Sequence, residues 1–324
     1  MSMHFHFGVL LLALLLDALI GDPDWLWRKV SHPVVWIGGL IDRLDERYNK
    51  SIDSQKRRQQ KGVFVLIVLI IIGAVCGWVL QLLINTLVLP FILEAIVVAV
   101  FLSSRSLYDH VQQVARKLEY SDLSQARDAV AQIVGRDRDT LDRSAISRAA
   151  IESLAENFSD GVIAPALWYL IAGLPGLIVY KMVNTADSMI GHKTARYRIF
   201  GWAVARFDDL INLPASRITA ILCILAVAIL LTKTEAKQAL LCIYRDASKH
   251  RSPNAGYPES AMAGGLNIAL SGPRAYDGKM GNEAWINERG RKQLEPADIT
   301  SSLSIYVTSV CLFAGIVGVL GIVF

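Results

Sequence analysis

Residues 63–102 limit the possible folds more than any other part of the sequence. This stretch of about forty residues contains one acidic residue, Glu94, and one proline, Pro90. An α-helix needs about 20 apolar residues to cross the hydrocarbon core of a bilayer. The stretch therefore predicts two membrane crossings joined by a tight turn, with Glu94 near a helix end or facing other parts of the protein.

Apolar runs recur along the whole chain, so we expect an all-α, polytopic integral membrane protein. Hydrophobic residues make up 53% of the sequence, and the mean hydropathy of +0.39 is too high for an ordinary soluble protein. About five hydrophobic segments are expected, some broken or re-entrant, in a single membrane domain over residues 1–324. The apolar segments lie near residues 1–20, 63–86, 88–104, 162–180, 211–231 and 302–324.

Two of these segments differ from a plain membrane-spanning helix in their sequence. Residues 162–180 contain Pro165, Gly173, Pro175 and Gly176, and a helix interrupted so often is expected to be broken or re-entrant. Residues 1–20 are expected to form a retained helix rather than a signal peptide, because they lack a basic n-region and a small-residue cleavage site.

Polar loops at 21–62, 103–161, 181–210 and 233–300 separate the apolar segments. By their Lys and Arg residues the loops 21–62, 103–161 and 233–300 count as basic, so these main loops are expected on the cytoplasmic side of the cell's inner membrane. Residues 181–210 would lie outside if both neighbouring segments cross, and inside if both dip in and return; we favour the inside. The periodicity of 103–161 predicts a layer of helices, and a short helix is expected over 259–266.

Several common types of site are excluded by the sequence. There is no P-loop, G-x-S-x-G, HExxH or dinucleotide glycine fingerprint, and no CxxC pair. The net charge of +4 is explained by basic loops that set topology and meet anionic lipid, so no nucleic-acid partner is expected.

Polar residues within or beside the apolar segments form three candidate faces. Such groups are costly near hydrocarbon unless they are paired, hydrated or bound to a ligand. The first face is Glu152, Glu156 and Asp160, the second is Lys181, Asn184 and Asp187, and the third is Arg206, Asp208, Asp209 and Asn212. Alternating carboxylates and cations suit Mg²⁺ and phosphate. The alternative is a set of intramembrane salt bridges without a ligand.

A glycine-rich loop provides a second candidate. Ser252-Pro253-Asn254-Ala255-Gly256, followed by Pro258-Glu259, can offer backbone N–H groups to an anion, or can be a simple surface turn. Near the N-terminus, Trp25, Trp27 and Trp36 suit the headgroup level of the membrane, which leaves His32 and Asp22 unexplained.

Long motifs in a fixed order resemble the CbiB/CobD family of cobalamin-biosynthesis membrane proteins, the adenosylcobinamide-phosphate synthases. They are DALIGDP at 17–23, HPVVWIG at 32–38, VGRD at 134–137, ESLAENFSDGVIAP at 152–165, PGLIVYKMVNTADSMIGH at 175–192, RYRIFGWAVARFDDLINLPASR at 196–217 and SPNAGYPESAMAGGL at 252–266. The resemblance covers nearly the whole chain.

The resemblance implies an amide ligation in cobalamin (vitamin B12) biosynthesis. The ring D propionate of (adenosyl)cobyric acid would be joined to (R)-1-amino-2-propanol or its O-phosphate, giving (adenosyl)cobinamide or its phosphate. Such a bond needs an activated carboxylate, so ATP and Mg²⁺ are expected, with an acyl phosphate formed before the amine attacks. The expected partners are the corrinoid substrate, aminopropanol or aminopropanol phosphate, membrane lipid and other cobalamin-pathway enzymes.

Combining the three faces with this reaction gives each candidate residue a role. The expected catalytic residues are His32, Glu152, Glu156, Asp160, Lys181 and Asp187. The expected metal ligands are Glu156, Asp160, Asp187, Asp208 and Asp209. Substrate binding is expected from Asn157, Asn184, Arg196, Arg206, Asn212, Ser252, Asn254 and Glu259. Within these sets, Lys181, Arg196 and Arg206 would hold phosphate oxygens, and His32 or a carboxylate would take the amine proton.

Two other classes of protein fit the same pattern. A corrinoid transporter can be built from broken helices and buried carboxylates, and it would move its substrate without forming a product. A membrane scaffold for other corrin enzymes would bind without turnover. The large polar loops favour an enzyme.

Overall fold

The computed structural model describes residues 3–134, 141–276, 279–281 and 283–323. The chain forms two compact units. Unit 1 comprises Met1–Ser103, Ala164–Asn212 and Leu320–Phe324, and unit 2 comprises Ser104–Ile163 and Leu213–Val319. Most of the VGRD motif, residues 135–137, lies outside the described residues.

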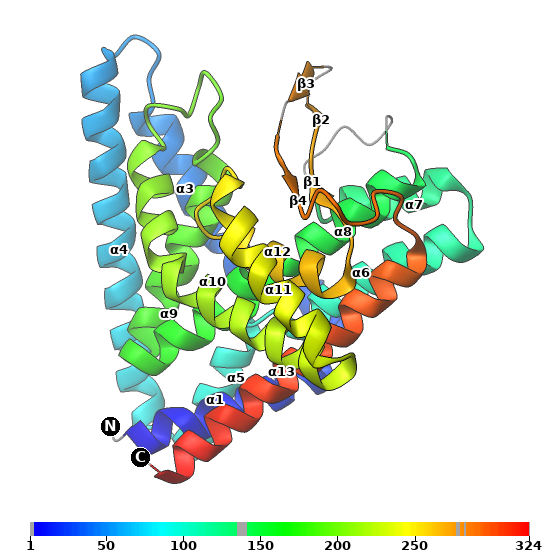
Figure 1. The fold of residues 1–324 in the computed structure, drawn as a ribbon. Helices are drawn as coiled ribbons and strands as arrows, with labels where there is room; N and C mark the ends of the chain where they lie inside the picture. Colours follow the sequence, from blue (N-terminus) through cyan, green and yellow to red (C-terminus); the bar gives the residue numbers. More distant parts are fainter. Residues whose placement is uncertain (1–2, 135–140, 277–278, 282, 324) are drawn as a thin grey trace. The chain divides into compact units, whose positions relative to one another are not determined.

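Unit 1 is built on two long helices that pack along each other. Its elements are α1 (Met3–Ile20), α2 (Asp24–Trp27), α3 (Pro33–Tyr48), α4 (Gln55–Asn85), α5 (Pro90–Phe101), α9 (Ala164–Ile190) and the first part of α10 (Trp202–Leu230) (Figure 1). Contacts between α4 and α9 are extensive. A Cβ on Gly77 of α4 would lie only 2.5 Å from the Cα of Pro175, so the two backbones approach closely because glycine stands there.

Helix α9 is broken, as its prolines and glycines predict. Ala172 (φ −138°, ψ 18°) and Gly173 (φ 61°, ψ −151°) leave the helical region, and the positive φ of Gly173 suits only glycine. Pro175 follows directly and has no N–H to continue the hydrogen-bond ladder. The chain therefore changes direction inside an apolar helix, as expected for a discontinuous segment.

Glu94 of α5 faces protein, as expected from the sequence. Its side chain is fully buried. It accepts hydrogen bonds from Gln81 Nε2 at 2.5 Å and Tyr169 Oη at 2.7 Å. The carboxylate is thus compensated by neutral donors on α4 and α9.

Unit 2 combines helices with two short strand pairs. Its helices are α6 (Ser104–Tyr120), α7 (Leu123–Ala131), α8 (Arg143–Phe158), the π-helix η2 (Ser159–Ile163), the rest of α10 from Leu213, α11 (Lys233–Asp246), the 3₁₀ helix η3 (Ala247–Lys249), α12 (Gly256–Leu266) and α13 (Pro296–Val323, of which residues up to Val319 belong here). Strand β1 (Leu270–Ser271) pairs antiparallel with β4 (Trp285–Ile286), and β2 (Arg274–Tyr276) with β3 (Lys279–Gly281). The helical layer expected in 103–161 and the helix expected over 259–266 are both confirmed.

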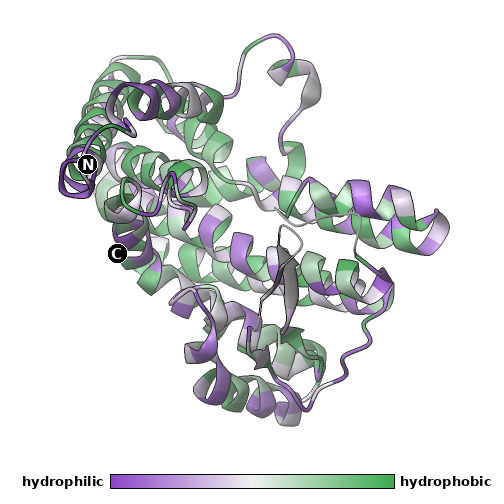
Figure 2. Cartoon of the chain, turned by 90° about the horizontal axis from the view of Figure 1, so that it is seen from above, coloured by the Kyte–Doolittle hydropathy of each residue, from purple (hydrophilic) through white to green (hydrophobic). Residues whose placement is uncertain are grey.

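Within the described residues, five helical stretches are long and apolar enough to cross a membrane. They are Gln55–Asn85, Pro90–Tyr120, Arg143–Ile190, Trp202–Leu230 and Pro296–Val323, with a shorter apolar helix at His4–Ile20. Figure 2 shows that hydrophobic residues make up much of the length of the helices. On α4 large apolar side chains, among them Ile67, Ile71 and Trp78, remain exposed on the protein surface. Such a surface is stable against lipid rather than water. The all-α, multi-spanning fold expected from the sequence is therefore confirmed.

Candidate functional site in two polar clusters

A network of polar side chains joins α9 and α10 inside unit 1. We name Tyr180, Asn184, Asp187, Asp208 and Asn212 the membrane cluster. Tyr180 Oη donates to Asn212 Oδ1 at 3.0 Å. Asn212 Nδ2 donates to Asp208 Oδ2 at 3.0 Å, and Asn184 Nδ2 donates to Asp208 Oδ1 at 3.4 Å. Both oxygens of the Asp208 carboxylate are thus held by neutral amides.

The charge of Asp208 is not matched by a nearby cation. Its side chain is buried, and among the described residues no Lys, Arg or His nitrogen lies within 4.0 Å of its carboxylate. The Asp187 carboxylate is close enough to act on it electrostatically. An Asp208 carboxylate held by two amides, with the Asp187 carboxylate nearby, forms a hard-oxygen environment that would attract a cation.

Gly191 makes room for the Asp187 side chain just beyond the end of α9. A Cβ on Gly191 would lie 1.9 Å from Asp187 Oδ1 and 2.6 Å from the Asp187 carbonyl oxygen. A larger residue at position 191 would therefore have to displace the carboxylate or the end of the helix. Lys181, Asn184 and Asp187 keep the expected three-residue spacing on α9, and all three are half-buried.

His32 has a structural role at the start of α3. Its Nδ1 accepts from the backbone N–H of Val34 at 3.2 Å, and its Nε2 lies 3.2 Å from the carbonyl oxygen of Val100. Burial lowers the pKa of His32, and the Asp22 carboxylate opposes this only in part. In the neutral form of His32, both ring nitrogens have a hydrogen-bond partner. The geometry shows a helix cap, while the expected role as proton acceptor stays a prediction.

The arginines expected to hold phosphate each have a carboxylate partner. Arg196 Nη2 lies 2.5 Å from Asp45 Oδ2, and Arg206 Nη1 lies 3.5 Å from Asp209 Oδ2 one helical turn later. Arg206 is exposed and Asp209 is half-buried, whereas Asp208 and Asn212 are buried. The four residues of the expected third face therefore differ in their environments.

In unit 2 the three carboxylates near the end of α8 have different environments. Glu152 is buried and its Oε1 accepts from the backbone N–H of Ser271 at 2.6 Å. Glu156 is exposed, and Asp160 is half-buried in the π-helical segment η2. The wider π turn interrupts the spacing that was expected to align all three. Asn157 is exposed and donates to the carbonyl of Ser153 at 2.9 Å.

A second network surrounds the glycine-rich loop of unit 2. We name Arg217, His250, Ser252, Asn254 and Glu259 the loop cluster. Asn254 Oδ1 accepts from Arg217 Nη1 at 3.0 Å, and His250 Nε2 lies 3.6 Å from Glu259 Oε1. The structure thus brings together the expected Ser252, Asn254 and Glu259, and adds two residues that the sequence analysis missed.

Two of the backbone N–H groups expected to face an anion are already engaged within the loop. Ser252 Oγ accepts from the backbone N–H groups of Asn254 and Ala255, both at 3.2 Å. The better-placed anion ligand is the Arg217 guanidinium. It lies 3.8 Å from the ring centroid of Tyr257, a cation–π contact that fixes its orientation.

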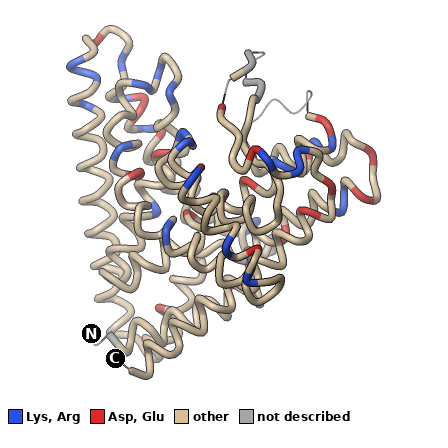
Figure 3. The backbone as a smooth tube through the Cα atoms, in the orientation of Figure 1, with Lys and Arg blue, Asp and Glu red and all other residues tan. Residues whose placement is uncertain are grey.

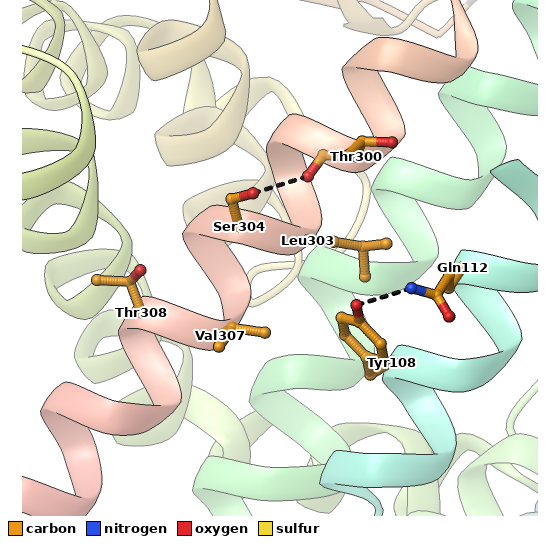
Figure 4. Close-up of a pocket in the computed structure, with 7 residues that line it drawn as sticks. All are labelled: Tyr108, Gln112, Thr300, Leu303, Ser304, Val307 and Thr308. Atoms are coloured by element: carbon orange, nitrogen blue, oxygen red, sulfur yellow. Dashed lines mark hydrogen bonds between the residues drawn. The ribbon is translucent and has the colours of Figure 1, made fainter.

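A small pocket elsewhere in unit 2 carries no charged group. It has a volume of about 320 Å³ and lies between α6 and α13, lined by Tyr108, Gln112, Thr300, Leu303, Ser304, Val307 and Thr308 (Figure 4). Gln112 Nε2 donates to Tyr108 Oη at 2.8 Å. Neutral hydroxyls and amides can bind a ligand but cannot take a proton at neutral pH, so we do not assign catalysis to this pocket.

Among the described residues no three His, Cys, Asp or Glu side chains are gathered closely enough to hold a metal ion by themselves. Mg²⁺ usually keeps several waters and uses only one or two protein carboxylates together with substrate phosphate. The two aspartates of the membrane cluster meet that smaller requirement. The metal roles of Glu156, Asp160, Asp187, Asp208 and Asp209 stay predictions.

Long helices with exposed apolar surface and buried polar clusters define a multi-pass helical membrane protein. Comparison with known proteins identifies its family: the model of the CobD/Cbib protein family matches residues 10–306, so the chain belongs to that family.

Curated relatives match over nearly their whole length. Relatives named cobalamin biosynthesis protein CobD are similar to this chain at 50% identity in Sinorhizobium sp, covering 95% of this chain and 96% of the relative, and at 48% in Rhizobium meliloti, covering 94% of each. No solved structure matches the chain.

Proposed function

We propose that this protein acts in cobalamin biosynthesis as an amide-forming ligase. It would join (adenosyl)cobyric acid to (R)-1-amino-2-propanol or its O-phosphate, and the product would be (adenosyl)cobinamide or its phosphate. The observation that carries the proposal is the match, at 50% identity over 95% of the chain, to a relative named cobalamin biosynthesis protein CobD. The ligation itself is our extension of that name.

The membrane cluster supports the proposal because it could bind a cation that the ligation needs. Asp208 keeps both carboxylate oxygens in fixed directions because Asn184 and Asn212 donate to them. Asp187 adds a second negative charge. These residues fit Mg²⁺ bound with phosphate, or the ammonium group of aminopropanol. When bound, ATP and Mg²⁺ would supply the activation that amide formation in water requires.

The loop cluster supports binding of an anionic substrate group. Arg217 is held by Asn254 and by the Tyr257 ring, so its remaining N–H groups point in fixed directions. A planar guanidinium binds carboxylate or phosphate through two parallel hydrogen bonds. We assign Arg217 to the corrinoid propionate or to a substrate phosphate.

A turnover assay tests the proposal directly. The full chain, purified in detergent, would be mixed with adenosylcobyric acid, aminopropanol phosphate, Mg²⁺ and ATP, and the new amide would be detected by mass. We expect product that depends on ATP and Mg²⁺. Corrinoid movement into vesicles without a new amide would instead identify a transporter, and saturable corrinoid binding with neither result would identify a scaffold.

A further inference from the structure

A basic pocket lies in unit 1 where α3 leads into α4. Its volume is about 770 Å³, and its lining includes Glu46, Asn49, Lys50, Ser51, Arg58 and Arg196. It stands beside the beginning of α4, where basic residues gather at one end of the helix (Figure 3). Apart from Arg196, the sequence analysis gave none of these residues a role.

The floor of the pocket is an ordered polar network. Asp45 and Asn49 are buried, and Asn49 Nδ2 donates to Asp45 Oδ1 at 2.8 Å. Asn49 Oδ1 accepts two hydrogen bonds from Arg58, from Nε at 3.1 Å and from Nη2 at 2.9 Å. Two buried side chains therefore fix the plane of the Arg58 guanidinium before any ligand arrives.

The charges of the pocket are only partly matched. Arg196 is paired with Asp45 of the floor, and among the described residues that line the pocket Glu46 is the only one with a carboxylate. Arg58 donates to neutral oxygens, those of the Asn49 amide and the Arg196 carbonyl. In the part of the chain that the structure describes, neither Arg58 nor Lys50 has a carboxylate within 4.0 Å. Two cations thus face the pocket with one opposing carboxylate.

We propose that this pocket binds a phosphate group through the oriented Arg58 guanidinium and the Lys50 ammonium. Arg58 Nε and Nη2 are engaged by Asn49 and Arg196, so the two N–H groups of Nη1 remain for phosphate oxygens, and the flexible Lys50 ammonium adds a point charge. Two kinds of molecule could present this phosphate group to the pocket. One is a soluble phosphate monoester or polyphosphate, and in that case the inference rests on the proposed ligase reaction. The other is the headgroup of an anionic phospholipid at the membrane surface.

The first experiment measures binding of inorganic phosphate and pyrophosphate to the full chain by calorimetry in a neutral detergent. We expect Arg58→Gln to weaken the affinity at least tenfold. The matched control is Lys56→Gln, an exposed residue of the same basic run that does not line the pocket, and it should stay within twofold. Arg58→Lys keeps the charge but loses the fixed direction of the Nη1 donors, so its affinity should lie between those of the other two variants.

A second experiment identifies the source of the phosphate. In nanodiscs of phosphatidylcholine, loss of aminopropanol phosphate or ATP binding by Arg58→Gln would identify a soluble ligand. Loss of phosphatidylglycerol retention by the same variant in mixed nanodiscs, measured by native mass spectrometry, would identify a lipid headgroup. Equal phosphate, soluble-ligand and lipid binding by Arg58→Gln and Lys56→Gln would overturn the proposal.

Loss of phosphate binding must be distinguished from loss of folding and from loss of ligase activity. If thermal unfolding shows that Arg58→Gln does not fold, Lys50→Gln takes its place, because Lys50 is exposed and forms no part of the floor. Binding is measured without turnover. An inactive wild type that still binds phosphate would therefore contradict only the ligase, and an active Arg58→Gln with unchanged binding would contradict only the pocket.

Discussion

Asp208 in unit 1 and Asp246 in unit 2 are both buried aspartates, but their carboxylates are held by different groups. Asp208 accepts from the amides of Asn184 and Asn212. Asp246 is held by Arg245 and Lys249, each at 2.7 Å, and by the backbone N–H of Asn287 at 2.9 Å. One carboxylate is held only by neutral donors, and the other is paired with two cations of the protein.

The difference separates binding from structural support. A carboxylate paired with cations has no free attraction for a ligand, whereas a carboxylate held only by neutral donors stays costly until a cation arrives. We therefore assign ligand binding to the membrane cluster and stabilisation of unit 2 to Asp246. Four experiments test this contrast, from the largest expected effect to the smallest.

Replacing Asp208 should give the largest loss of turnover. Asp208→Asn keeps the size of the side chain but removes its charge, so we expect a decrease of at least roughly 100-fold, comparable to the loss of one key electrostatic contact in an active site. Amide formation per folded molecule is the measurement. Asp109→Asn, an exposed residue paired with Arg105 on α6, is the matched control. Turnover of Asp208→Asn equal to that of the control would contradict the assignment.

Replacing Asp246 should affect stability instead. Asp246→Asn removes two ion pairs whose basic partners are about half exposed, so we expect the free energy of unfolding to fall by about 2 kcal/mol rather than by the full value of a buried pair. Denaturant titration in detergent measures this change. Turnover per folded molecule should stay near the wild-type value. A loss of turnover as large as that of Asp208→Asn would contradict the assignment of a purely structural role to Asp246.

The contribution of Asp246 should also depend on pH. Burial alone would raise the pKa of Asp246, but hydrogen bonds from Arg245, Lys249 and the Asn287 backbone hold it below its ordinary value. A carboxyl group with a lowered folded pKa stabilises the protein fully above its unfolded pKa of about 3.9, and this contribution is lost as the pH falls through the folded pKa. The difference in unfolding free energy between wild type and Asp246→Asn should therefore shrink below about pH 4. A constant difference from pH 6 to pH 3 would show that the ion pairs do not cause it.

Local signals in the sequence predicted the fold better than the contacts of the site. The break at Gly173 and the helix α12 were predictable because proline and glycine act on their own backbone. The partner of Arg196 is Asp45, 151 residues earlier in the chain, and no local pattern reveals it. The π turn at Asp160 likewise escaped the periodicity, since only one extra residue in the turn distinguishes it from an α-helix.

Tyr180 was missed although a signal was present, because it lies four residues before Asn184 and so on the same face of α9. Tyr180→Phe removes the hydroxyl that donates to Asn212 Oδ1 and leaves both amide donors on Asp208. We expect the smallest effect here, about 1 kcal/mol or a few-fold lower turnover. Tyr108→Phe, which loses one hydrogen bond outside the cluster, is the matched control. If Tyr180→Phe were as inactive as Asp208→Asn, the cluster would depend on its hydroxyl rather than on the charge of Asp208.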